Sequence, residues 1–221
     1  MWIVIEGADG SGKTTTAKLL VDRLNELGKR AIYVANPGTT ELGLKVRDII
    51  KTQKLQPLEY TYLFSGVMYN LVNEFVISAK ESGDIIVMDR WCRSTFIYQG
   101  FYENFKKIEG KDFNRDRLFG WITEYSLISQ RPAYEFILLT DPELAWNRCG
   151  ARDGAIKDPF EDNGYEWFKY IHEQYIATRY DKSLGQVFEM FNNPYYIPED
   201  SVENRVNMIL DHLRNRVPNV I

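Results

Sequence analysis

Residues 7–14 of this chain read G-A-D-G-S-G-K-T and fit the pattern G-x-x-x-x-G-K-[ST] in full. The run follows the apolar residues 2–5 and precedes a predicted helix, which is the context that a phosphate-binding loop needs. Glycines let successive backbone N–H groups point at polyphosphate oxygens, and the N-terminus of the next helix adds a favourable dipole. Lys13 would bind the terminal phosphates, and the Thr14 hydroxyl would ligate magnesium. The sequence therefore predicts a nucleoside triphosphate site.

A carboxylate and an arginine stand together at the end of a second apolar run. Asp89 and Arg90 directly follow residues 85–88, which are all apolar. Asp89 is placed to hold magnesium directly or through water, and the planar donor fork of Arg90 suits a phosphate. An ion pair at a strand end is the alternative interpretation. The sequence has no guanine-reading N-K-x-D motif, which argues against a switch GTPase.

Apolar runs alternate with amphipathic segments along the chain, which predicts strands alternating with helices. This order is typical of an α/β fold with a parallel sheet covered on both faces. Ligands of such sheets bind at the carboxyl ends of the strands, where the loop at 7–14, the Asn36 turn and Asp89 fall. The predicted strands span 2–5, 31–34, 84–90, 134–139 and 186–191, and the predicted helices span 13–27, 40–52, 57–81, 93–104, 113–129, a segment from 141, 164–180 and 200–216.

The composition limits the class of protein. The chain has 221 residues, 44% of them hydrophobic, and a net charge of −4, which suits one α/β domain with a full core. No basic stripe for a nucleic acid polymer and no apolar run near membrane-spanning length is visible. The first strand leaves no room for a signal peptide, so a cytoplasmic location is expected. Cys92 and Cys149 are expected to be reduced thiols, and His172 and His212 are expected on solvated helix faces.

The order and spacing of several short segments resemble the thymidylate kinase family of P-loop nucleoside monophosphate kinases, from residue 2 to about residue 180. The resemblance implies one P-loop kinase domain over residues 1–221, with a five-stranded parallel sheet and a small lid at about 148–162. It implies a homodimer that uses Mg²⁺ and moves the γ-phosphoryl of ATP to dTMP, giving dTDP. The segments that carry it are 5–14, 37–38, 63–65, 89–90, 94–95, 98–100 and 141–143, followed by Arg148 and Arg152.

The resemblance also implies roles on the donor side of the reaction. Lys13 and Arg90 would hold the two phosphates in line, and Asp9 would lie near the acceptor sugar and phosphate. The catalytic arginine is expected from the lid, as Arg152 in preference to Arg148, because the loop itself offers small neutral residues. The implied ATP-binding residues are Gly10, Ser11, Gly12, Lys13, Thr14, Thr15 and Arg148, and the implied metal ligands are Thr14 and Asp89.

On the acceptor side, the resemblance assigns most roles to two helices. Phe64 would stack on thymine, Thr95 and Gln99 would meet the base edge, and the Tyr98 ring would disfavour a ribose 2′-hydroxyl. Arg47 would reach the acceptor phosphate. The implied acceptor-binding residues are Asp9, Arg47, Phe64, Met68, Arg90, Thr95, Tyr98 and Gln99.

The chain departs from the family pattern at three places. Met68 stands where the family has an arginine that reads a thymine carbonyl, and a thioether cannot donate that hydrogen bond. Ala35 and Asn36 replace an Arg-Glu pair, and the lid segment 158–161 carries Pro159 in place of arginine. These changes leave open a kinase for dUMP or a modified pyrimidine. A P-loop regulatory ATPase is a third reading, which the segments 89–90 and 98–99 argue against.

Overall fold

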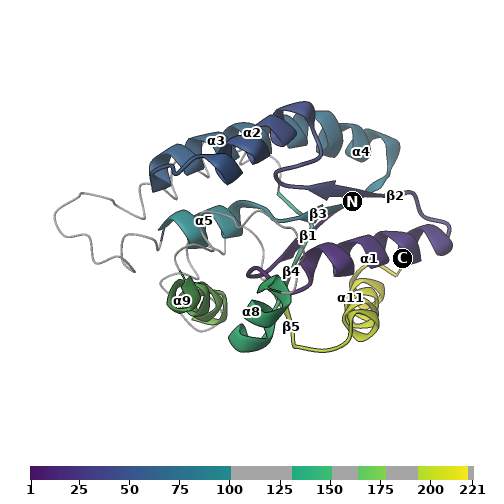
Figure 1. The fold of residues 1–221 in the computed structure, drawn as a ribbon. Helices are drawn as coiled ribbons and strands as arrows, with labels where there is room; N and C mark the ends of the chain where they lie inside the picture. Colours follow the sequence, from purple (N-terminus) through teal and green to yellow (C-terminus); the bar gives the residue numbers. More distant parts are fainter. Residues whose placement is uncertain (101–130, 151–163, 178–193, 219–221) are drawn as a thin grey trace.

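The computed structural model describes residues 1–100, 131–150, 164–177 and 194–218. Its centre is a sheet of five parallel strands in the order β2-β3-β1-β4-β5, with helices on both faces (Figure 1). The predicted α/β fold with a five-stranded parallel sheet is confirmed. The strands are β1 (Trp2–Glu6), β2 (Ala31–Ala35), β3 (Ile85–Asp89), β4 (Tyr134–Leu138) and β5 (Tyr195–Ile197).

The parallel register brings the carboxyl ends of three strands to one edge of the sheet. β1 and β3 are buried along their whole length, as expected for central strands made of apolar runs. Asp89 pairs with Ile5 on one side and with Ala35 on the other. The predicted fifth strand at 186–191 lies outside the described residues, and the strand that pairs with β4 is β5.

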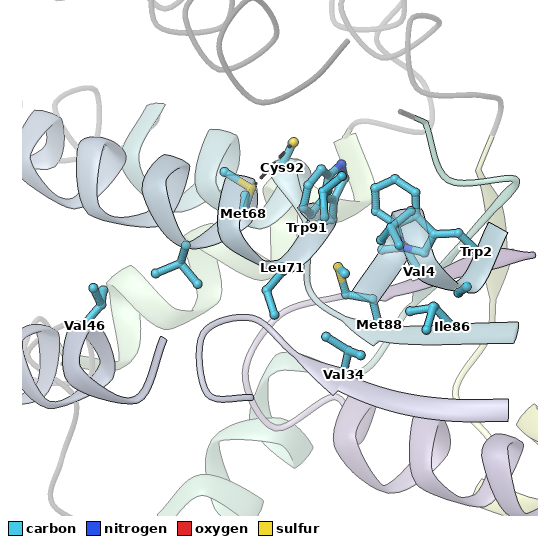
Figure 2. Close-up of a cluster of buried hydrophobic side chains, with 14 of the residues drawn as sticks. Trp2, Val4, Val34, Val46, Met68, Leu71, Ile86, Met88, Trp91 and Cys92 are labelled. Carbon is cyan, nitrogen blue, oxygen red and sulfur yellow. Dashed lines mark hydrogen bonds between the residues drawn. The ribbon is translucent and has the colours of Figure 1, made fainter. Parts of the chain in front are cut away.

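The two faces of the sheet are covered by different helices (Figure 1). Because side chains alternate along a strand, Ile3 and Ile5 pack with one set of helices, and Trp2 and Val4 with the other (Figure 2). No helix within the described ranges has the length and apolar character needed to cross a lipid bilayer. The first face carries α1 (Lys13–Glu26) and α11 (Val202–Arg216), and the second α2 (Glu41–Thr52), α3 (Pro57–Leu71), α5 (Cys92–Gly100) and α9 (Gly164–Ala177).

The helix predicted at 57–81 is present with an internal irregularity. α3 runs into a π-helical turn, η1 (Val72–Val76), and continues as α4 (Ile77–Ser82). Gly83 ends it with a φ of 79°, as a glycine after a helix commonly does. A shorter helix, α8 (Pro142–Gly150), follows β4 and packs on α9. The helix predicted at 113–129 and the loop predicted at 150–163 lie outside the described residues, apart from residue 150.

Candidate functional site

A cavity of about 850 Å³ opens where β1, β2 and β3 end. The phosphate-loop sequence forms one part of its wall, and residues of α2, α3 and α5 form another. The structure thus brings together most of the residues predicted from the sequence. Those that line the cavity are Asp9, Gly10, Gly12, Lys13, Thr14, Thr15, Arg47, Phe64, Asp89, Arg90, Thr95, Tyr98 and Gln99.

The loop at 7–14 wraps tightly because its glycines adopt conformations that side chains disfavour. Gly10 has a φ of 73°, and a Cβ atom there would lie 2.3 Å from the carbonyl oxygen of Ala145. Gly12 has a φ of 86° and directly precedes α1, so the N-terminus of that helix faces the cavity. Backbone N–H groups and a helix dipole at the end of a cavity form an anion-binding site.

Lys13 is buried at the first position of α1 and folds back across the loop. Its Nζ donates a 2.6 Å hydrogen bond to the Ala8 carbonyl oxygen. Burial, and then the nearby Arg90 charge, lower the pKa of Lys13 to about 8. A cation that is costly to bury and poorly neutralised will gain from an arriving phosphate.

Thr14 and Asp89 meet at the start of α1 and the end of β3. Thr14 Oγ1 donates to Asp89 Oδ2 at 2.5 Å, and the Tyr33 hydroxyl donates to the same oxygen at 3.2 Å. The other oxygen, Asp89 Oδ1, is buried and has no hydrogen-bond partner among the described residues. Magnesium in phosphate sites takes one or two protein oxygens besides phosphate and water. The hydroxyl and the orphaned carboxylate oxygen fit that requirement.

Asp9, Arg90 and Tyr98 form a linked group beside the loop. An Arg90 Nη2 atom pairs with Asp9 Oδ1, and the Tyr98 hydroxyl donates to Asp9 Oδ2 at 2.7 Å. Burial, and then the Asp9 charge, raise the pKa of Tyr98 well above its usual value, so the hydroxyl stays protonated and donates. Arg90 holds a φ of 72°, a strained conformation that costs about 1–3 kcal/mol and is found mainly at functional sites.

Glu6 supports this group from below, a role that the sequence reading did not assign. Its Oε1 accepts hydrogen bonds from Trp91 N at 2.7 Å and Ser94 N at 3.1 Å, and its Oε2 accepts from the Ser94 hydroxyl at 2.6 Å. The Glu6 carboxylate therefore fixes the start of α5, and the Ser94 hydroxyl also accepts from Arg90 Nη1 at 2.9 Å. A buried acid at the end of an otherwise apolar strand was the available signal.

The far end of the cavity combines an aromatic face with unpaired polar atoms. The Phe64 ring stacks on Tyr60 at a centroid distance of 6.3 Å and lines the cavity. Gln99 Oε1 and Asn36 Oδ1 are buried there and have no hydrogen-bond partner in the described part of the chain. Arg47 Nη1 donates to the Pro37 carbonyl oxygen at 3.2 Å. This end can stack a planar ring, donate to an anion and accept a hydrogen bond.

Comparison of the sequence with known proteins identifies the family of this chain. The family description "Thymidylate kinase" matches residues 5–186. This chain belongs to the thymidylate kinase family. The thymidylate kinase of Thermoanaerobacter sp. (strain X514) is 31% identical over 177 residues, which cover 79% of this chain and 81% of that protein. The thymidylate kinase of Brachyspira hyodysenteriae is 28% identical over 215 residues, covering 97% and 92%. The predicted family is thus confirmed.

Met68, where the resemblance implies an arginine, lies outside the cavity. It is fully buried in the core between α3 and α5, with its Sδ 3.7 Å from Cys92 Sγ (Figure 2). The placement of Met68 among acceptor-contacting residues is therefore not reproduced, because its side chain is fully enclosed by the core cluster that α3 and α5 form. Lys51, which the sequence reading missed, lines the cavity from α2 and lies one turn beyond Arg47.

Two of the residues predicted to bind ATP do not line the cavity: Ser11, within the phosphate loop, and Arg148, on α8. Arg148 Nη2 pairs with Glu199 at 3.2 Å, and its Nη1 lies 3.5 Å from the Gly10 carbonyl oxygen. Ser11 is fully buried. Arg152 and the lid residues 151–163 lie outside the described residues.

The two histidines differ from their predicted exposure. His172 is 3% exposed, and its two ring nitrogens face the Thr140 carbonyl oxygen at 3.3 Å and the Asp9 carbonyl oxygen at 3.1 Å. The prediction of a solvated face was wrong for His172, because it lies on the buried stripe of α9. His212 is partly buried, with its ring 4.4 Å from that of Tyr195.

Arg205, to which the sequence analysis gives no role, reaches the same loop from the C-terminal helix α11. Its side chain is 2% exposed and donates to the Ser11 carbonyl oxygen at 2.6 Å and the Leu139 carbonyl oxygen at 2.8 Å. It also pairs with Glu199 at 2.9 Å. No local pattern around residue 205 indicates this contact, since its partners are distant in sequence.

Proposed function

We propose that this protein transfers the γ-phosphoryl group of Mg-ATP to dTMP, giving ADP and dTDP. The observation that carries the proposal is one cavity lined by both a phosphate loop and a second, acceptor-like set of groups. An ATPase needs the first set and has no use for the second. The names of the relatives, which are thymidylate kinases, support the same acceptor.

On the donor side, the triphosphate would lie along the N-terminus of α1. Backbone N–H groups of the loop and the Lys13 ammonium would bind its oxygens, so Lys13 would exchange the Ala8 carbonyl for phosphate. Mg²⁺ supplies charge neutralisation at the phosphates when bound. The Thr14 hydroxyl and Asp89 Oδ1 would hold it, directly or through water.

On the acceptor side, Arg90 and Arg47 would hold the monophosphate. Arg90 is paired with Asp9 before substrate binds, and a phosphate offers its fork two further oxygens. Asp9 would then face the acceptor sugar while its other oxygen stays on the Tyr98 hydroxyl. Phosphoryl transfer depends mostly on such positioning and charge neutralisation.

The base would stack on Phe64 with its edge toward Thr95 and Gln99. Gln99 Oε1, which has no hydrogen-bond partner among the described residues, would accept a hydrogen bond from the ring N–H of thymine. The centroid of the Tyr98 ring lies 5.3 Å from the Arg90 guanidinium, and this contact would help to fix the position of the ring. The ring would then clash with the 2′-hydroxyl of a ribonucleotide. This clash would favour deoxynucleotides.

The remaining parts of the proposal rest on the family resemblance. A lid at about 148–162 would close over ATP and bring the Arg152 cation to the transferring group. The chain would act as a single domain over residues 1–221 and as a homodimer in the cytoplasm.

The test is coupled ADP release by the purified protein with Mg-ATP and one acceptor at a time. The acceptors are dTMP, dUMP, dCMP and the ribonucleotide TMP, and one reaction contains no acceptor. We expect release that requires dTMP and that Lys13→Met abolishes. Lys45→Met is the matched control, because Lys45 is exposed on α2 and pairs with Glu41. Acceptor-independent release would instead support an ATPase, and a preference for dUMP would support altered base choice.

A further inference from the structure

We propose that Arg205 is a positioning residue for the donor triphosphate: it fixes the peptide between Ser11 and Gly12 so that the Gly12 N–H faces the phosphates. The inference rests on the proposed function, because it takes a triphosphate as the ligand of the loop at 7–14. Arg205 lies in α11, beyond residue 186, where the family match ends. Its Nη1 donates a 2.6 Å hydrogen bond to the Ser11 carbonyl oxygen.

Because of the geometry of the peptide bond, this contact also fixes the direction in which the Gly12 N–H points. In a trans peptide the carbonyl and the following N–H point to opposite sides. A guanidinium bound to the Ser11 oxygen therefore points the Gly12 N–H away from α11 and toward the cavity that Gly12 lines. The Gly12 N–H makes no hydrogen bond to the described residues. Since glycine adopts many conformations at little cost, an outside anchor decides which way this peptide faces.

The same guanidinium joins the loop to two other segments. Its Nη2 donates to the Leu139 carbonyl oxygen at 2.8 Å and to Thr140 Oγ1 at 3.1 Å, at the end of β4. Its Nε donates to the Pro198 carbonyl oxygen at 3.2 Å, before α11. The phosphate loop is thereby anchored to β4 and to the segment that enters α11.

The charge balance around Arg205 also suits an anionic ligand. Glu199 is the carboxylate that pairs with Arg205, at 2.9 Å, and it is shared with Arg148 at 3.2 Å. Asp200 is a second carboxylate that interacts with Arg205, but it is exposed to solvent, so the buried Arg205 guanidinium is only partly neutralised. The buried Lys13 ammonium lies on the same loop. A buried charge is costly when it is incompletely neutralised, so a polyphosphate is stabilised here.

His172 makes a similar contact two peptide bonds earlier in the loop, at the peptide between Asp9 and Gly10. Its Nε2 lies 3.1 Å from the Asp9 carbonyl oxygen, which directs the Gly10 N–H to the opposite side. Carbonyl oxygens of the loop are thus held from outside by side chains of α9 and α11. This arrangement is the one expected when N–H groups must converge on an anion.

The experiment compares ligand binding by Arg205→Met, Arg205→Lys and the wild-type protein. The dissociation constants of Mg-ATP and dTMP are measured by calorimetry, and folding is checked by near-ultraviolet circular dichroism. We expect Arg205→Met to raise the dissociation constant of Mg-ATP about tenfold or more, which is about 1.4 kcal/mol, with that of dTMP unchanged within about twofold. Arg214→Met is the control, because Arg214 is exposed on the same helix and pairs with Asp211.

Each outcome decides the inference. Folded Arg205→Met protein with wild-type affinity for Mg-ATP would overturn it, as would an equal loss for both ligands, which indicates a purely structural role. If Arg205→Met does not fold, Arg205→Lys decides: it keeps the charge without the planar fork, so we expect several-fold weaker Mg-ATP binding. Failure of the proposed function is separate, since it would appear as wild-type protein that binds Mg-ATP but does not phosphorylate dTMP.

Discussion

Raising the pH should weaken ATP binding in a way that follows the protonation of Lys13. Its ammonium is buried, contacts the Ala8 carbonyl oxygen and has a pKa of about 8, lowered by burial and then by Arg90. A bound triphosphate places opposite charge beside it and raises that pKa, so ATP prefers the protonated form. As pH rises through 8, the unliganded protein loses this proton and must regain it to bind.

The size of the effect on ATP affinity follows from the fraction of the protein in which Lys13 is protonated and able to bind ATP. With a pKa of about 8, the protonated fraction of Lys13 is about 0.9 at pH 7 and about 0.1 at pH 9. The apparent dissociation constant is the intrinsic one divided by that fraction, so it should rise about tenfold, or about 1.4 kcal/mol. Near pH 8, binding should take up about half a proton per ATP.

Calorimetric titration with ATP at pH 7, 8 and 9, in buffers of different ionisation enthalpy, measures both quantities. Lys13→Arg is the control, because a guanidinium stays charged over this range and should bind ATP with little dependence on pH. A wild-type dissociation constant that is flat from pH 7 to 9 would refute the reasoning. An equal slope in Lys13→Arg would do the same, because it would assign the titration to another group.

Three further outcomes are expected. Lys13→Met should stabilise the unliganded protein at pH 7 by up to about 3 kcal/mol. The folded-state pKa of Lys13 is lowered, so its buried charge destabilises the fold at every pH below 8. A urea unfolding midpoint at or below that of the wild type would contradict this. Glu135→Gln should lower the free energy of unfolding by about 3–5 kcal/mol, because it removes the carboxylate that the buried Arg93 contacts at 2.7 Å. Thermal unfolding measures this loss, and an unchanged melting temperature would be evidence against it. Asp89→Asn should raise the Mg²⁺ concentration for half-maximal activity about tenfold, since an amide oxygen is a weaker ligand than the buried Asp89 Oδ1. A magnesium titration of ADP release tests this, and an unchanged midpoint would exclude Asp89 as a metal ligand.

The sequence by itself determined the features that depend on neighbouring residues. The glycines, Lys13 and Thr14 lie within one short segment, so the loop at 7–14 could be predicted from its amino-acid sequence alone. The apolar runs predicted β1 and β3, because a strand buried on both faces has no other pattern. Alternation of strands and helices then placed Asp89 and the loop at one edge of the sheet.

Tertiary structure decided how deeply each helix residue is buried. Phe64 and Met68 lie one turn apart on the same face of α3 and pack against the same core cluster, yet Phe64 also lines the cavity whereas Met68 is fully enclosed. His172 lies on the buried stripe with Phe168 and Tyr175, a helical spacing that was visible in the sequence. It was missed because exposure was assigned from residue type, whereas a buried histidine can lie against carbonyl oxygens of distant segments and donate its ring N–H to one of them.

The contacts that hold the phosphate loop from outside could come only from the folded chain. Thr14 and Asp89 are 75 residues apart, and both were predicted because the sheet edge brings such positions together. Arg205 and Ser11 are 194 residues apart, and no motif or periodicity relates them. The sequence therefore determined the chemistry of the loop. The three-dimensional packing of α11 on α1 and the sheet decided how its peptides are oriented, because a hydrogen bond depends on position in space.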